Sequence, residues 1–136
     1  MFVLKKEIKA WWPVKVSEPD ETIPGHFADY EFEVLFRLLD RDEARAQNDA
    51  RARLIEGDAS VTSLSSANER MRAIEQFDDD SFVGVISDWR GIQDERKAEV
   101  PFSEAILRQA LKRPHIRKAI FDAYQAMASG EGLRKN

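Results

Sequence analysis

The sequence predicts an α+β fold, in which a small N-terminal antiparallel sheet of about three strands packs with about four or five helices. Two observations predict it. Apolar and polar residues alternate through most of residues 1–39, which is the period of a strand with one wet face. From residue 40 to residue 130 the spacing changes to that of amphipathic helices, so the C-terminal half is expected to be all helical.

Length and composition restrict the class of protein. The 136 residues fit a single domain covering residues 1–136, and the absence of cysteine excludes disulfides and thiolate metal sites. The net charge of −4 argues against a dedicated nucleic-acid binder, which carries a basic excess. The sequence shows neither a signal peptide nor an apolar run long enough to span a membrane, so we expect a soluble cytoplasmic protein without membrane contact.

Three strand-like runs are expected within residues 1–39, and their short connections imply antiparallel pairing. Pro13 cannot donate to a ladder, so its strand is expected at a sheet edge. Trp11 and Trp12 are adjacent and therefore point to opposite faces, which leaves one of them for a helix to cover or for an interface. The residues expected to face inward are, run by run, Phe2, Leu4 and Ile8; Trp12, Val14 and Val16; and Tyr30, Phe32, Val34, Phe36 and Leu38.

The middle of the chain is expected to form two or three polar helices. Capping pairs are formed by Asp40 with Glu43, before a helix that runs to Gly57, and by Ser66 with Glu69. The run Asp78-Asp79-Asp80 is expected to interrupt the second helix. Apolar side chains then recur at helical spacing, so we prefer a helix for Val83–Ile86, although a short strand is the alternative; these side chains are Phe82, Val85, Ile86 and Trp89.

The last helices carry clear boundary signals. Ser103 is an N-cap, Pro114 suits a first helical turn, and Gly130 is a stop before an exposed tail at residues 131–136. The sheet and the helices are expected to share one core, which contains Phe36, Trp89, Ile106, Ile120 and Tyr124.

Residues with catalytic chemistry are few. His26 and His115 have no ligand spacing, and a surface position is favoured for both. The acidic run Asp78–Asp80 with Glu75 could bind a divalent cation through oxygen ligands, but it lacks the glycine and the spaced glutamate of an EF-hand, so a solvated capping turn is favoured. Residues 60–66 are rich in serine but form no nucleophile elbow. We therefore predict no catalytic, cofactor-binding or metal-binding residue and do not expect an enzyme.

A basic cluster lies where the last two helices meet. On a net-acidic chain, a solvated face or an acidic protein partner is favoured over nucleic acid for such a cluster. The candidate partner-binding residues are Trp11, Lys112, Arg113, Arg117 and Lys118.

Several short motifs follow one another along the chain. The front half contains Trp12-Pro13-Val14-x-Val16, a proline-containing loop and the alternation from Phe32 to Leu38. The back half contains Trp89-x-Gly91-Ile92, Val100-Pro101-Phe102-Ser103, Tyr124 and the closing Arg134-Lys135-Asn136. Their order and spacing resemble the tail assembly chaperones of long-tailed bacteriophages and prophages. Two departures are the poorly matched charged helix after Asp40, and Arg96 and Lys97, which stand where similar sequences often carry a glycine turn and could mark a longer or differently folded connector.

The resemblance implies a non-enzymatic protein that coats the tape-measure protein, helps to recruit tail-tube subunits, and leaves before the tail is complete. It implies the tape-measure and tail-tube proteins as partners, no cofactor, the host cytoplasm as location, and absence from the mature virion. Proteins of this kind self-associate, and some also exist in a longer frameshifted form. The alternatives are a virion structural protein of the tail-completion or connector type, and a small enzyme or nucleic-acid-binding regulator.

Weak self-association is also expected from the residues themselves. Pro13 indicates an edge strand, and an exposed sheet edge pairs readily with another chain. The charged helix of residues 40–57 has an apolar stripe too thin to be explained by its own core. Either surface is a candidate for contact between copies.

Overall fold

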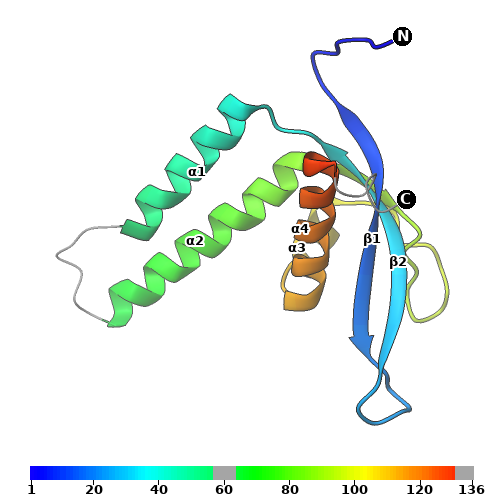
Figure 1. The fold of residues 1–136 in the computed structure, drawn as a ribbon. Helices are drawn as coiled ribbons and strands as arrows, with labels where there is room; N and C mark the ends of the chain where they lie inside the picture. The colour runs from blue at the N-terminus through cyan, green and yellow to red at the C-terminus, as the bar shows by residue number, and fades with distance from the viewer. Residues whose placement is uncertain (57–63, 131–136) are drawn as a thin grey trace. The chain divides into compact units, whose positions relative to one another are not determined.

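A computed structural model describes residues 1–56 and 64–130 of the chain. The described residues form a three-stranded antiparallel sheet and four helices, which confirms the α+β class (Figure 1). In chain order the elements are β1 (Lys9–Pro19), β2 (Phe27–Arg37), α1 (Arg41–Glu56), α2 (Leu64–Val85), β3 (Ile86–Arg90), α3 (Glu104–Ala110) and α4 (Pro114–Ser129).

These elements form two compact units. The sheet unit comprises residues 1–38 and 86–130 and holds the three strands with α3 and α4. The helical unit comprises residues 39–56 and 64–85 and holds α1 and α2. That the whole chain is one domain stays a prediction. None of the described helices has the length and apolar character needed to cross a membrane.

The sheet of the first unit has the order β1-β2-β3, so β1 with Pro13 is an edge strand, as predicted. Trp12 lies opposite Val34, and Val14 opposite Phe32. Because partners across a ladder share a face, the even-numbered residues of β1 and β2 form one face of the sheet. That face is the core: Val14, Val34 and Phe36 are each 0% exposed.

α4 covers this even-numbered face. The ring of Tyr124 meets the ring of Phe36 edge-on, with centroids 5.6 Å apart, and Ile120 is 1% exposed. Pro114 is the first residue of α4, and Gly130 ends the helix in the left-handed conformation at φ 74°. Both boundary predictions are confirmed, as is the Ser103 cap of α3, whose side chain accepts a hydrogen bond from the Ile106 N–H.

The first predicted strand is wrong. Residues 1–8 form no strand, and Phe2 and Leu4 are 85% and 88% exposed. The third strand is instead β3, from the C-terminal half that was expected to be all helical. Alternation within a segment shows that it can pair but not which segment pairs with it, and β3 pairs with residues 33–36 of β2 on the side away from β1.

The prediction of a helix over Val83–Ile86 is correct only as far as Val85, where α2 ends, because β3 begins at Ile86. Ile86 and Trp89 are both buried although they are three positions apart, a spacing that strand alternation alone would place on opposite faces. The register between β2 and β3 shifts between Leu35 and Phe36, and this irregularity brings both side chains to the core. A bulged strand thus reproduces the spacing of a helix.

Three of the five predicted core residues are buried, and one of the five, Ile106, is exposed, as is Tyr30, which was expected to face inward. Phe36, Trp89 and Ile120 are buried, and Tyr124 is half-buried. Ile106 is 39% exposed, because α3 turns the next residue, Leu107, fully inward. Tyr30 is 58% exposed although it lies on the core face, because it sits toward the loop end of the β1–β2 hairpin.

In the helical unit, the Asp40–Glu43 capping pair is confirmed: Asp40 Oδ1 accepts from the Glu43 N–H at 2.8 Å. No residue of α1 is buried. α2 begins at Leu64, so Ser66 lies inside it rather than at its cap. The acidic run does not interrupt α2, since Arg51 of α1 holds Asp78 through two hydrogen bonds of 2.8 and 3.0 Å, which raise the pKa of Arg51. Gly57, the serine-rich loop at 60–63 and the tail at 131–136 lie outside the described residues.

Candidate protein-binding site

An open groove of about 490 Å³ lies in the sheet unit, between the end of the β1–β2 hairpin, the segment after β3, and helices α3 and α4. Its volume falls within the roughly 300–1,000 Å³ of typical ligand pockets. Much of its lining is apolar and comes from both layers: Val16, Phe32 and Trp89 from the sheet, and Ile106, Ile116 and Ile120 from the helices.

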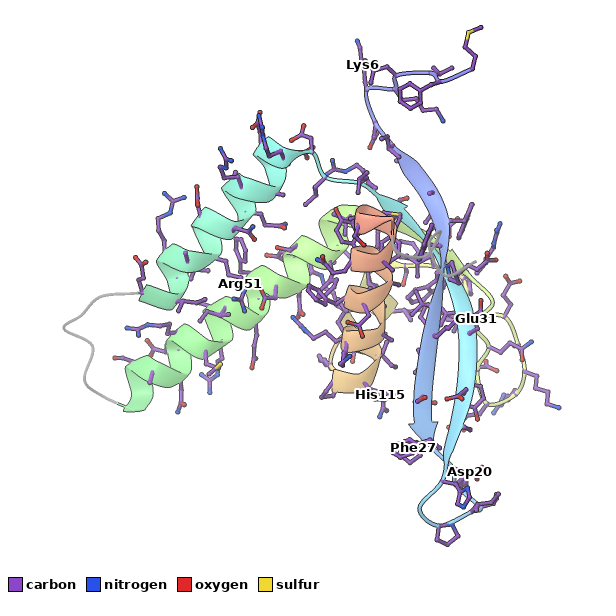
Figure 2. The ribbon with its side chains drawn as sticks, in the orientation of Figure 1. Lys6, Asp20, Phe27, Glu31, Arg51 and His115 are labelled. Carbon is purple, nitrogen blue, oxygen red and sulfur yellow. The ribbon has the colours of Figure 1, made fainter. Side chains whose placement is uncertain are left out.

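The charged residues that line the groove are Glu18, Glu31 and Asp94, and none of the lining residues is basic. Glu31 belongs to the odd-numbered face of the sheet and borders the groove from the β2 strand. Glu18 Oε2 lies 2.6 Å from His115 Nε2, a contact that joins β1 to the first turn of α4 and is an ion pair when the histidine is protonated. Figure 2 shows His115 at the end of α4 that faces the hairpin. The groove therefore presents an apolar floor with acidic side chains.

One wall of the groove is fixed by the segment that follows β3. The Trp89 Nε1–H donates to the Val100 carbonyl at 2.9 Å, and the Trp89 ring meets Phe102 edge-on at 5.2 Å. Gly91 has φ 84°, and a Cβ there would lie 3.6 Å from Phe32 Cα. These contacts give the Trp89-x-Gly91 and Val100-Pro101-Phe102 motifs a shared structural role, which is to hold this segment against the sheet.

The connector between those motifs is a tight turn. Asp94 Oδ1 accepts from the backbone N–H groups of Arg96 and Ala98, and a bridge pairs Gln93 with Glu99. Lys97 has φ 63°, the left-handed region that glycine adopts without strain. Lys97 therefore stands in this turn in a backbone conformation that favours glycine.

An unpaired strand edge borders the groove. β3 pairs with β2 only from Glu33 to Phe36, whereas β2 begins at Phe27. Among the described strands, residues 27–32 therefore pair only with β1. Three residues of this stretch, Tyr30, Glu31 and Phe32, also line the groove.

The predicted basic cluster surrounds the start of α4. Lys112 and Arg113 are exposed just before it. The Arg117 guanidinium donates to the Leu111 carbonyl at 3.2 Å, and Lys118 Nζ lies 2.6 Å from Asp122. Arg117 thus holds the junction between the helices together, while the other three cations are exposed.

Trp11 is not part of that surface. It lies on the odd-numbered face of the sheet, opposite α4, and is half-buried there. The Arg90 guanidinium stacks 4.1 Å above its ring, and Arg90 Nε donates to Glu33 at 2.8 Å. The arginine therefore covers the tryptophan, which the sequence could not indicate because β1 and β3 are far apart along the chain.

Sequence reasoning missed two features of this unit. Phe121 is 50% exposed on α4, three residues after Lys118 and therefore on the same side of the helix. Its position off the apolar stripe of Ile120 and Ala123 was the available signal. The contact of His115 with Glu18 had no local signal, since 97 residues separate the two.

Possible metal ligands do not gather in the described part of the chain: no group of three or more His, Asp or Glu side chains is placed to hold an ion. In the acidic run, Asp78 is held by Arg51, and Asp80 accepts from Gln76 at 3.0 Å.

Comparison with protein-family models, curated proteins and solved structures finds no match to the chain.

Proposed function

We propose that the protein is a non-catalytic tail assembly chaperone of a phage or prophage, which binds helical segments of a tape-measure protein and assists tail-tube assembly. The order of motifs from Trp12 to Tyr124 supports the class. The structural observation that carries the binding role is the exposed aromatic residue Phe121 on α4, one turn from the exposed cation Lys118.

That surface, the α4 outer face, consists of Lys118 and Phe121 with Lys112 and Arg113 before the first turn. An exposed aromatic side chain supplies most of the apolar contact in many interfaces, and surrounding charges select the partner and speed encounter. An amphipathic helix with an apolar stripe and flanking acidic residues fits this arrangement.

Repeated weak contacts suit the proposed role. A tape-measure protein is long and helical, so one chain offers many successive binding segments. Each contact need not be strong, because neighbouring copies bound along one chain gain from effective concentration. Weak single contacts also allow the chaperone to leave when tube subunits replace it.

The proposal is tested by binding to the tape-measure protein of the same phage. Reversing Arg113 and Lys118 to Glu should slow association and reduce its dependence on salt, because these charges steer encounter. Replacing Phe121 with Ala should weaken binding by at least about tenfold, as loss of an aromatic anchor does.

The matched control reverses two exposed arginines of α1, Arg45 and Arg53, to Glu, which changes the net charge equally at a helix where no residue is buried. Association measured by surface plasmon resonance at several salt concentrations separates the two double variants. Wild-type binding by both the Arg113/Lys118 and the Phe121 variants would remove the α4 outer face as the docking surface.

A further inference from the structure

The hydrogen-bonded ladder of the sheet ends early on one side of β2, and the vacancy lies beside the groove. Glu33 pairs with Arg90, so a continued ladder would place Gly91 opposite Phe32. Gly91 has φ 84°, which is not an extended conformation, so the chain leaves the ladder there. Among the described strands, residues 27–32 are therefore unpaired along one edge, over roughly 20 Å at the usual rise of a strand.

This edge lacks the usual protection of an edge strand. The N–H and C=O groups of an unpaired edge can bind another extended segment, and proteins commonly block such edges with lysine or proline. Residues 27–32 contain neither, and their aromatic residues Phe27 and Tyr30 are 67% and 58% exposed. Figure 2 shows Phe27 and Glu31 along this stretch. The edge is thus open to a further strand.

A strand added there would have two different sides. On the even-numbered face of the sheet, its side chains would meet the apolar groove lining that the helices supply, which includes Ile106, Ile116 and Ile120. On the odd-numbered face, its side chains would lie beside Asp29 and Glu31. Neighbours of opposite charge on adjacent strands stabilise the pairing. The two sides therefore favour a segment in which apolar residues alternate with cations.

Negative charge remains at this edge after the contacts within the chain are considered. On β1, Lys15 lies opposite Glu31, and Ser17 lies opposite Asp29 and donates to its carboxylate. One cation thus faces two carboxylates, and the groove itself has acidic lining residues and no basic one. These charges favour a basic occupant over an acidic one.

We propose that the edge and the groove together bind an extended segment of another protein, in which apolar residues alternate with Lys or Arg, by strand addition to residues 27–32 of β2. The segment gains backbone hydrogen bonds from the edge and burial of its apolar side chains in the groove. Its cations face Asp29 and Glu31. This partner differs in conformation and in charge from the acidic helix proposed for the α4 outer face, so the inference is independent of the proposed function.

A blocked heptapeptide of alternating Lys and Val is the probe. Its binding to the full chain is measured by NMR titration up to about 1 mM peptide, a range that covers weak binding. Amide shifts should change saturably and concentrate at residues 27–32 and in the segment that follows β3. A peptide of the same composition, with the lysines grouped at one end, should bind at least about fivefold more weakly, because it has equal charge without the alternation.

Two N-methylated forms of the probe test strand addition itself. In an added strand, every second N–H points to the neighbouring strand and the others point to solvent. Methylation of one alternate set should therefore weaken binding at least about tenfold more than methylation of the other set. Equal affinity of the two forms would show that the peptide does not pair with the strand edge and would overturn the proposal.

The charges of the edge are tested by Asp29→Asn combined with Glu31→Gln, which preserve the shape of both side chains. This double variant should bind the probe at least about threefold more weakly and with a smaller dependence on salt. The matched control is Glu69→Gln combined with Glu75→Gln, at two exposed carboxylates of α2. It changes the net charge equally and should bind the probe as the wild type does.

The competing occupant is the exposed arm of residues 1–8, from the same copy or another, because Phe2 and Leu4 precede two lysines. Phe2→Ser combined with Leu4→Ser should leave the affinity for the probe unchanged. Tighter binding by this variant would assign the groove to the arm and overturn the proposal. So would the absence of saturable binding, wild-type affinity in the Asp29/Glu31 variant, or shifts confined to the α4 outer face.

Discussion

At residue scale, Lys97 occupies a backbone conformation that glycine adopts without strain, at φ 63°. A left-handed conformation costs a non-glycine residue about 1–2 kcal/mol, while glycine loses more entropy on folding. We therefore expect Lys97→Gly to raise the free energy of unfolding by about 0.5–1 kcal/mol. Lys97→Ala is the control, because it removes the charge and keeps the strain; equal denaturant midpoints for the two variants would contradict this account of the turn.

Asp20 organises the hairpin loop between β1 and β2. Its Oδ1 accepts from the Thr22 N–H and hydroxyl, both at 2.8 Å, and from the Ile23 N–H at 3.2 Å. The hydrogen bond from the Thr22 backbone, then those from its hydroxyl and from Ile23, lower the pKa of Asp20 below its ordinary value.

A lowered pKa fixes the sign of the pH dependence. The contribution of Asp20 to the stability of the folded state is present above the pKa that its carboxyl has in the unfolded chain. It is lost as pH falls through the lower pKa that the carboxyl has in the folded protein. The Thr22 and Ile23 amide signals in NMR should therefore titrate with a midpoint below that of an unfolded aspartate, and should lose this transition in Asp20→Asn. A midpoint at or above the unfolded value would show that the loop does not hold the carboxylate.

At the scale of elements, α3 decides which neighbouring side chain enters the core. Leu107 is 0% exposed and Ile106 is 39% exposed. Leu107→Ala should cost about 2–5 kcal/mol of unfolding free energy, as should truncation of the buried Ile120, whereas Ile106→Ala should cost less than about 1 kcal/mol. Denaturant melts of the three variants check this order, and a larger loss at position 106 than at 107 would reverse the assigned face of α3.

The elements that sequence could predict are those with local signals. Asp40 with Glu43 and Ser103 mark helix starts through hydrogen bonds made within a few residues, Pro114 and Gly130 mark the ends of α4 through their own backbone conformations, and all four signals are confirmed. β3 was missed because its bulge gives Ile86 and Trp89 a helical spacing. The secondary structure of such a segment is decided by its pairing with a distant strand and not by its local pattern.

The candidate site was beyond sequence reasoning for the same reason. The groove is assembled from segments separated by most of the chain, such as Val16 and Ile116. The basic cluster was visible because its residues lie close together in the sequence, but the sequence did not show that Arg117 is half-buried while Lys112, Arg113 and Lys118 are exposed. Arg117 turns back to the carbonyl of Leu111, the C-cap of α3, across the turn between the two helices.

At the scale of the molecule, separate surfaces can serve separate partners. The sheet unit carries the groove, the strand-like arm and the α4 outer face, and the helical unit carries a helix with no buried residue. The proposed contact with a tape-measure protein is assigned to the α4 outer face alone, so variants of Arg113, Lys118 and Phe121 separate it from contacts made by the other surfaces.

The central claim is that the chain is an assembly chaperone rather than a part of the finished tail. Quantitative mass spectrometry of tail intermediates and of purified mature particles from the same infection or induction tests it most directly. The account predicts that the chain accompanies the tape-measure protein in the intermediates and is absent from the particles. A fixed number of copies in mature particles would contradict it and assign the protein to the structural components of the virion.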